Sequence, residues 1–351
     1  MSTASQVNEQ RPPQAKGDLI AAEDISVDGQ NDADSVFSED SSSTTSIASS
    51  ILEYRKMRGR TYHSDKFTNN YHLPNDDQQI ESEELCHHAM TMLFDDQLFL
   101  APLEKDKIHR VLDVGTGSGI WAIEFADRFP NASVIGTDLS PSQPQWVPPN
   151  VRFEIDDATL DWTWNDNYFD FIHARYLFGG IQDWAGFFKE AYRCCAPGGW
   201  VQSAECDIEF RSDDGSTELE PVLASYGELF REAGKVLNRS FFVQDLQQQA
   251  FDEAGFVEQR TVRYKSPIGP WAKDRKLAEV GRVARAALEN DVEGKFKVVP
   301  LLSYTQMVWH NVLQRSATEY EAWLANLRKA MRNPKVHSYM TTHVVYGRKP
   351  E

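Results

Sequence analysis

Two kinds of stretch alternate over the middle of the chain. Short runs of apolar residues, as expected of buried strands, are separated by segments whose apolar residues recur at helical spacing. Such alternation is typical of parallel strands joined by helices that cover both faces of a sheet, so the pattern predicts an α/β fold. In chain order, the predicted strands and helices of this core occupy residues 110–114, 120–129, 132–138, 151–155, 169–174, 185–195 and 200–205.

The same spacing continues on both sides of the core. Before it, Leu85, Ala89, Met92 and Leu93 fall on one side of a helix predicted over residues 80–94. After it, proline and glycine at 197–199 break the pattern, and longer helical stretches follow. The later predictions are helices at 219–236, 244–254, 301–313 and 317–331 and strands at 257–264 and 341–346.

The first 50 residues have a different composition from the rest. They carry two basic and nine acidic residues, and Phe37 is their only aromatic residue. From Ser38 to Ser50, nine of the thirteen residues are serine or threonine. Because this segment has too little apolar surface to offset the entropy lost on ordering, we predict a disordered, acidic, Ser-rich tail over residues 1–50.

Charge and cysteine usage exclude several classes of protein. The net charge of -17 argues against direct nucleic-acid binding, because phosphate would be repelled over most of the surface. No apolar run reaches the roughly 20 residues that span a bilayer, and the polar start is unlike a secretory leader. The four cysteines lack C-x-x-C spacing, and Cys86-His87-His88 is no metal site, since neighbouring helical side chains diverge by about 100°. We therefore expect a cytoplasmic or nuclear protein without membrane or metal.

A glycine-rich turn supplies the first candidate chemistry. The predicted strand at 110–114 runs into Asp113-Val114-Gly115-Thr116-Gly117-Ser118-Gly119, and a helix follows. Glycines let the main chain approach a ligand at the carboxyl end of a strand. The acid two residues before the first glycine would repel a pyrophosphate, whereas it suits the cationic amino-acid part of S-adenosylmethionine. The spacing therefore favours this cofactor over NAD.

Two further acids follow the next predicted strands. Asp138 ends the second strand and can accept hydrogen bonds from both ribose hydroxyls. Asp157-Ala158 follows the third strand, where a carboxylate can accept from the adenine amine, with Asp156 as the alternative. The predicted cofactor-binding residues are Asp113, Gly115, Thr116, Gly117, Gly119, Asp138, Leu139, Asp157, Ala158 and His173.

These motifs, with Phe169-Asp170-Phe171-Ile172 and Pro197-Gly198-Gly199, resemble those of class I S-adenosylmethionine-dependent methyltransferases. More narrowly, the chain from about Tyr54 onward resembles the fungal LaeA-like methyltransferases. The supporting phrases are Gly59-Arg60-Thr61-Tyr62-His63, Leu73-Pro74-Asn75-Asp76, Gly119-Ile120-Trp121-Ala122-Ile123, Ile172-His173-Ala174-Arg175 and Val345-Tyr346-Gly347-Arg348-Lys349-Pro350.

The resemblance implies a Rossmann-like, seven-stranded, mostly parallel sheet with helices on both faces. Its last strand would be antiparallel and form a hairpin with the sixth, the helices between them would form a substrate cap, and the segment before the core would fold over the cofactor. The methyltransferase domain would then cover residues 51–351. Its expected parts are an N-terminal helical segment (51–107), the cofactor-binding core (108–206), a helical cap with the sixth strand (207–340) and the last strand (341–351).

Methyl transfer mainly requires alignment of the acceptor and exclusion of water, so sequence constrains the catalytic residue poorly. His173 and His310 are candidate bases, because histidine titrates near neutrality; backbone hydrogen bonding or core packing is the alternative for each. Arg175, Tyr176, Glu205 and Trp309 are candidate substrate contacts. For Arg175 the alternative is an ion pair with Asp183 or Glu205.

Three functions remain in competition. The first is an S-adenosylmethionine-dependent enzyme that methylates oxygen or nitrogen of a small-molecule acceptor in fungal secondary metabolism. The second is a LaeA-like regulator that acts through a protein partner, for which the acidic tail would serve as an interaction segment. The third keeps the fold and the cofactor without methyl transfer. The glycine spacing disfavours an NAD oxidoreductase.

Overall fold

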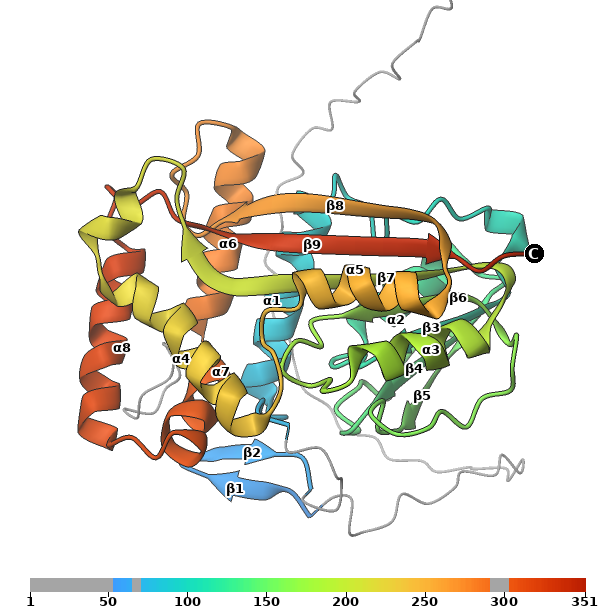
Figure 1. Cartoon of the computed structure of the whole chain (residues 1–351), viewed down its shortest axis with the longest axis horizontal. Coiled ribbons are helices and arrows are strands. Elements are labelled where there is room, and N and C mark those ends of the chain that lie inside the picture. The colour runs from blue at the N-terminus through green and yellow to red at the C-terminus, as the bar shows by residue number, and fades with distance from the viewer. Residues whose placement is uncertain (1–52, 65–70, 291–302) are drawn as a thin grey trace, which may run out of the picture. The chain divides into compact units, whose positions relative to one another are not determined.

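The computed structural model of the chain describes residues 53–64, 71–290 and 303–351. A seven-stranded sheet runs through its centre (Figure 1). The strands lie side by side in the order β5-β4-β3-β6-β7-β9-β8; β3 to β7 pair in parallel, and β9 is antiparallel to both of its neighbours. The predicted α/β fold with a reversed last strand is thereby confirmed. The strands are β3 (Arg110–Val114), β4 (Ser133–Asp138), β5 (Val151–Ile155), β6 (Phe169–Arg175), β7 (Cys195–Arg211), β8 (Val257–Pro267) and β9 (Tyr339–Arg348).

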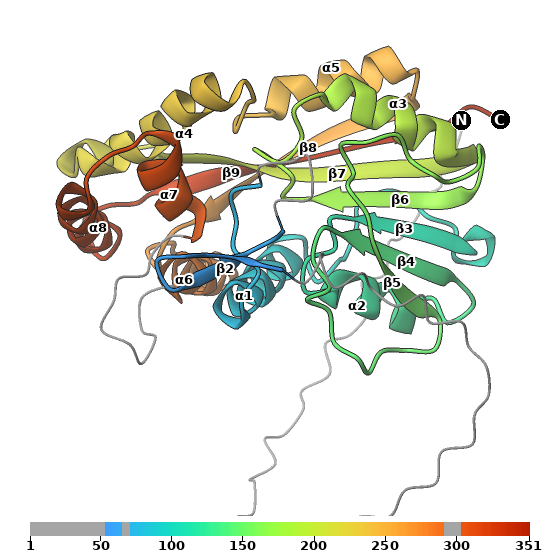
Figure 2. The same cartoon turned by 90° about the horizontal axis from the view of Figure 1, so that it is seen from below.

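Helices cover both faces of this sheet, as Figure 2 shows. One face carries α1 (Asp77–Leu93), α2 (Ile120–Arg128) and α6 (Arg275–Asn290), and the other carries α3 (Trp184–Cys194), α4 (Val222–Leu237) and α5 (Gln244–Ala254). Next to α4 lie the remaining helices: α7 (Ser303–Met307), a π-helical turn (Val308–Val312) and α8 (Ala317–Met331). Short 3-10 turns occupy Lys105–Lys107 and Ser216–Leu219.

The core has one apolar layer on each side of the sheet. On the α2 side, Trp121 and Phe125 are fully buried against Val111 and Phe171. The opposite layer is larger, because α3, α4, α5 and α8 all contribute side chains to it. β5 and β8 are the edge strands, and their side chains are more exposed than those of the central strands. The carboxyl ends of the central strands are therefore held by packing from both sides.

The segment before the core begins with a hairpin that the sequence pattern does not predict. β1 (Arg55–Met57) and β2 (Arg60–Tyr62) pair in antiparallel fashion. Arg60 donates two hydrogen bonds to Asp76, at 2.5 and 2.6 Å, and Asp76 also caps α1 by accepting from the Gln79 amide. The carboxylate of Asp76 therefore ties the hairpin to the start of the helix, so two of the phrases that carried the family resemblance fold against each other.

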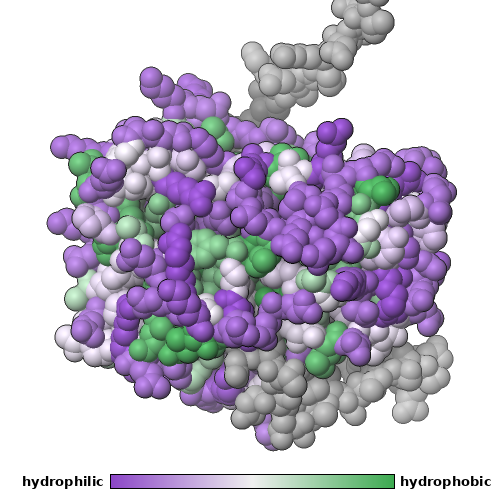
Figure 3. All heavy atoms as spheres, viewed as in Figure 1, coloured by the Kyte–Doolittle hydropathy of each residue, from purple (hydrophilic) through white to green (hydrophobic). Residues whose placement is uncertain are grey.

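The predicted helices over 80–94, 219–236, 244–254 and 317–331 are confirmed to within a few residues, whereas α6 was missed. The tail at 1–50 and residues 301–302 of another predicted helix lie outside the described residues. Within the described ranges, no helix is long and apolar enough to cross a bilayer. The face shown in Figure 3 is mainly hydrophilic, interrupted by small hydrophobic areas, one of them near the middle of the view.

Candidate functional site

A cavity opens where the parallel strands end, and we call it the strand-end cavity. It is lined by residues that follow β3, β4, β5 and β6, together with residues of α1 and of the segment before it. Asp113, Asp138 and Asp157, the three acids predicted at consecutive strand ends, all line it. Parallel strands bring their carboxyl ends to one edge of the sheet, and that geometry gathers these acids.

The glycine-rich turn forms the floor of this cavity. Gly117 has a φ of +56°, and its amide donates to Asp138 Oδ2 over 2.9 Å. A Cβ at this position would lie 2.5 Å from Glu83 Oε2. The backbone therefore needs glycine both for its left-handed angle and for the close approach of a neighbouring carboxylate.

Not every glycine of the turn faces the cavity. Gly115, Thr116 and Gly117 line it, whereas Gly119 does not. Gly119 precedes the first residue of α2, and a Cβ there would lie 2.5 Å from the Phe153 ring. The structure thus gives Gly119 a packing role against β5, and its contact with the cofactor stays a prediction.

Asp113 is buried beneath the turn and is already engaged. Its Oδ2 accepts from Thr116 Oγ1 over 2.6 Å, and its Oδ1 accepts from His173 Nδ1 over 2.7 Å. His173 is 1% exposed and stacks face to face on Trp121, with ring centroids 3.8 Å apart. Burial lowers the pKa of His173, although the hydrogen bond that His173 donates to Asp113 acts in the opposite direction.

His173 does not line the strand-end cavity. It pairs with Asp113 across β3 and β6, two residues before the strand ends at Arg175. Strand residues two apart point to the same side, so Arg175 reaches the cavity while His173 stays beneath it. This position supports neither of the roles predicted for His173, the base and the cofactor contact, and leaves it to orient Asp113.

Asp138, at the end of β4, and Asp157, after β5, both line the cavity. Asp138 Oδ1 accepts from the Ser140 amide over 3.1 Å, and burial raises the pKa of Asp138. Asp157 Oδ1 accepts from the amide and the hydroxyl of Thr159. Leu139, Asp156 and Ala158 also line the cavity, so both candidate partners for an adenine amine are present.

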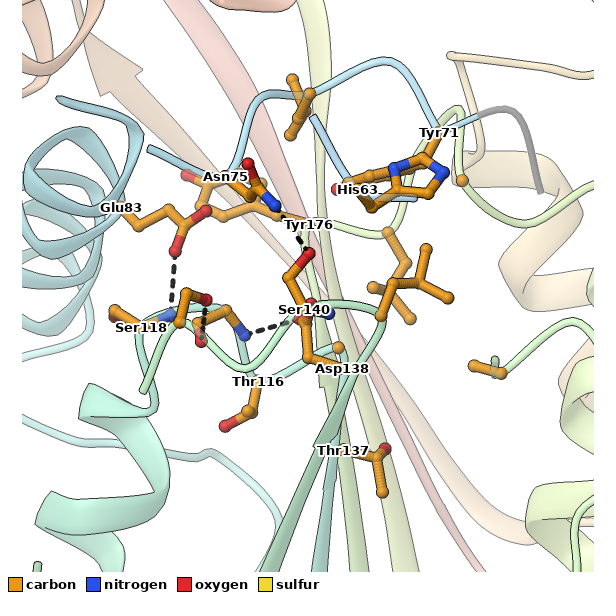
Figure 4. Close-up of a pocket in the computed structure, with 18 of the residues that line it drawn as sticks. His63, Tyr71, Asn75, Glu83, Thr116, Ser118, Thr137, Asp138, Ser140 and Tyr176 are labelled. Atoms are coloured by element: carbon orange, nitrogen blue, oxygen red, sulfur yellow. Dashed lines mark hydrogen bonds between the residues drawn. The ribbon is translucent and has the colours of Figure 1, made fainter. Parts of the chain in front are cut away.

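Glu83 is the site residue that sequence reasoning missed. It projects from α1 toward the glycine turn, as Figure 4 shows, and its Oε2 accepts from the Ser118 amide over 2.9 Å. Burial, reinforced by nearby Asp138, raises the pKa of Glu83 to about 7. Helical spacing predicted α1, but it cannot tell which polar residue of the helix will meet a loop 35 residues away.

The segment before α1 closes the other side of the cavity. His63, Tyr71 and Asn75 line it, and Asn75 Nδ2 donates to Ser140 Oγ over 3.1 Å (Figure 4). This agrees with the expectation that the N-terminal segment folds over the site. No sequence motif had singled out His63 or Tyr71 as site residues.

Among the predicted substrate contacts, Arg175 and Tyr176 line the cavity. Arg175 pairs with neither Asp183 nor Glu205. Its Nη2 lies 3.1 Å from His87 Nδ1, and His87 Nε2 lies 3.2 Å from Glu124. These two contacts link Arg175 through α1 to α2. Asp183 instead caps α3 by accepting from the Gly186 amide.

His310 and Trp309 lie away from the strand-end cavity, contrary to the idea that they reach over it. Trp309 Nε1 donates to the Ser316 carbonyl over 3.0 Å, and the His310 ring packs against Tyr320 on α8. Both belong to the apolar contact between the π-helical turn and α8. His310 Nδ1 also lies 3.2 Å from the Arg315 carbonyl oxygen, so both rings have polar partners within this contact.

Glu205 is 1% exposed and also lies outside the cavity. It accepts from the amides of Leu177 and Phe178, at 3.1 and 2.9 Å, and burial raises its pKa to about 8. Leu177 lines the cavity, whereas Glu205 holds the backbone behind it. The carboxyl group is therefore a support for the loop after β6, in place of the predicted substrate contact.

We expect Glu205→Ala to lower the free energy of unfolding by about 2–4 kcal/mol, because two buried amides lose their acceptor. Urea unfolding of the full chain measures this. Glu209→Ala is the matched control on the same strand, since Glu209 makes part-exposed ion pairs with Arg211 and Arg231, each worth at most about 1 kcal/mol. Equal losses in the two variants would contradict the supporting role of Glu205.

Within the described ranges, there is no group of three or more His, Cys, Asp or Glu side chains that could hold a metal ion. Side chains of Cys86-His87-His88 diverge: Cys86 lines the cavity, His87 meets Arg175, and His88 is exposed.

Residues 85–258 match the family model described as a methyltransferase domain. The chain is 35% identical over 321 residues to methyltransferase pytC of Aspergillus terreus, covering 91% of this chain and 95% of that protein. It is 31% identical over 278 residues to the probable methyltransferase tdiE of Emericella nidulans, covering 79% of this chain and 84% of that protein. It is also 28% identical to the protein-methionine methyltransferase laeA of Emericella nidulans, covering 85% of this chain and 77% of that protein.

Proposed function

This chain belongs to the class I S-adenosylmethionine-dependent methyltransferases, and we propose that it methylates an oxygen or nitrogen atom of a small molecule in fungal secondary metabolism. The observation that carries the proposal is the charge of the strand-end cavity. Among the described residues, five with carboxyl groups line it (Glu83, Asp113, Asp138, Asp156 and Asp157), against one arginine, Arg175. Such a lining suits a ligand with a sulfonium and an ammonium group and disfavours a pyrophosphate.

The residues present fit the cofactor. Asp138 would hold the ribose hydroxyls, and Asp157 with Ala158 would hold the adenine ring. The turn at Gly115–Gly117 and Glu83 would hold the methionine part, with the Glu83 carboxylate facing the ammonium group. Bound there, S-adenosylmethionine supplies a methyl group on a positively charged sulfur.

The chain itself supplies alignment and exclusion of water. Asp113 positions the glycine-rich turn by accepting a hydrogen bond from Thr116. His173 positions Asp113 by donating a hydrogen bond to it. Glu205 fixes the loop that carries Tyr176 and Leu177, and His63 and Tyr71 line the cavity from the segment before α1. Neither histidine first considered as a base lines the cavity, so we assign His173 to positioning and His310 to packing.

Cofactor binding should strengthen as the pH rises through the pKa of Glu83. That pKa is about 7, because burial and Asp138 raise it more than the hydrogen bonds from Gln79 and Ser118 and the charge of Arg175 lower it. Only the carboxylate form attracts an ammonium group, so we expect the affinity for S-adenosylmethionine to rise about eightfold between about pH 6 and 7.5. Calorimetric titration at several pH values checks this. In Glu83→Gln the rise should disappear; an unchanged rise would contradict the assignment.

The proposed reaction is tested with purified full-length protein, S-adenosylmethionine and an extract of host metabolites. We expect S-adenosylhomocysteine to accumulate together with a product heavier by one CH2 group, and neither to form with Gly117→Asp. Cofactor binding without any methylated product would favour a protein that keeps the cofactor for another purpose. Absence of cofactor binding would overturn the proposal.

The name of one relative, a protein-methionine methyltransferase, favours a second candidate function. In this second function, the chain regulates secondary metabolism by acting on a protein partner. A deletion strain separates the two: loss of one methylation step, with its unmethylated precursor accumulating, supports the biosynthetic role. Loss of many unrelated products would support the regulatory role.

A further inference from the structure

A second cavity adjoins the strand-end cavity, and we call it the apolar chamber. It lies between α1, α6, β7 and β9, and among the residues that the structure describes, none of the fifteen that line it is charged. Cys86 and Tyr176 line both cavities. Resting on the methyltransferase function proposed above, we infer that the apolar chamber binds the methyl acceptor, and that this acceptor is an uncharged, largely apolar ring compound that presents a hydroxyl group to Tyr176.

The lining of the apolar chamber sets the charge of its ligand. Apolar side chains such as Met90, Phe178, Ile208 and Leu288 make up most of it, and its polar groups are hydroxyls and thiols. An ion that entered would lose its hydration without meeting an opposite charge, which costs several kcal/mol. A carboxylate or a protonated amine is therefore excluded, whereas a neutral ring compound gains from burial of its surface.

Tyr176 stands at the boundary between the two cavities. Its backbone has a φ of +58°, uncommon for a residue other than glycine, and its amide donates to the Ala204 carbonyl over 3.1 Å. Within the part of the chain that the structure describes, its hydroxyl makes no hydrogen bond. Strained residues of this kind cluster at functional sites. Burial raises the pKa of Tyr176 well above its usual value, so the phenol stays protonated and can donate to an acceptor oxygen.

The lining of the apolar chamber includes residues that are withdrawn from solvent, since Thr342 and Tyr226 are 1% and 2% exposed. A hydroxyl acceptor fits better than an aliphatic amine, because an aliphatic amine is protonated near neutrality and none of the described residues that line the chamber offers it a carboxylate. The inference thus selects a hydroxyl oxygen over an aliphatic nitrogen as the acceptor atom.

The test uses three probes of one ring system on the full chain saturated with S-adenosylhomocysteine: naphthol (neutral), naphthoate (anionic) and naphthylmethylamine (cationic). We expect naphthol to bind at least about tenfold more tightly than either charged probe, as the desolvation cost of an ion requires. Ala287→Phe, which fills the apolar chamber from α6, should weaken naphthol binding by about tenfold or more and leave S-adenosylhomocysteine binding unchanged. Tyr176→Phe should weaken naphthol binding by a smaller factor.

Ala286→Phe is the matched control, because Ala286 is exposed on the same helix. If Ala287→Phe loses both ligands through misfolding, Ala284→Phe, at a half-buried position of the same lining, takes its place. Equal binding of the three probes, or naphthol binding that survives a filled chamber, would overturn the inference while leaving the methyltransferase function intact. Failure to bind S-adenosylhomocysteine at all would instead overturn the proposed function.

Discussion

Gly117→Val should reduce the affinity for S-adenosylhomocysteine by about 100-fold or more while the protein still folds. The backbone at Gly117 has a φ of +56°, which a β-branched residue adopts only with strain of about 1–3 kcal/mol. Any Cβ there would displace the Glu83 carboxylate, 2.5 Å away, and the rest of the side chain would occupy the strand-end cavity. Calorimetric titration with S-adenosylhomocysteine measures the loss.

Gly215→Val separates strain from blockage of the cavity. Gly215 has a similar φ of +74°, and a Cβ added there would meet only Glu218 Oε1, at 4.0 Å, among the described residues. Gly215 lines neither cavity. Both variants should lose comparable stability, and only Gly117→Val should lose ligand affinity. If the two variants bind S-adenosylhomocysteine equally well, the glycine turn is not where the cofactor lies.

Asp138→Ala is expected to weaken the binding of S-adenosylhomocysteine by about 100-fold, since hydrogen bonds to a charged group contribute about 1.5–3 kcal/mol each. Asp138 accepts from the amides of Gly117 and Ser140, which positions the turn, and its carboxylate is the proposed partner of the ribose hydroxyls. Removing it therefore disturbs both the turn and the ligand contact. The dissociation constants of the variant and the wild type provide the measurement.

Asp170→Ala controls for the loss of backbone acceptors. Asp170 accepts from the amides of His109 and Arg110, both at 2.8 Å, at the opposite end of the sheet. Its removal should cost stability of a similar size and leave affinity untouched. An Asp138→Ala protein that binds as well as the wild type would rule out the ribose contact.

Parallel-sheet geometry explains why the acids of the site were predictable. Each apolar run identified a strand, and in a parallel sheet every strand delivers its last residues to the same edge, so Asp113, Asp138 and Asp157 had to lie close together. The depth of a side chain along its strand was harder to infer. His173 comes two residues before the end of β6 and lies beneath the site, whereas Arg175 reaches it.

Contacts between distant segments explain what was missed. Glu83 meets Ser118 and Cys86 faces Tyr176 only because α1 folds across the strand ends, and no local pattern encodes that packing. β7 extends from Cys195 to Arg211, beyond the predicted 200–205 at both ends, and its start was missed because Pro197-Gly198-Gly199 lies within a bulged stretch of the strand. β1 and β2 have three residues each, too few to show alternation.

The most direct test is a crystal structure of the full chain with S-adenosylhomocysteine. We predict the ribose hydroxyls within hydrogen-bond distance of Asp138, the adenine beside Asp157 and Ala158, and the amino-acid end between Gly117 and Glu83. A nucleoside bound elsewhere on the protein, with these four side chains and the turn untouched, would contradict the assignment of the strand-end cavity.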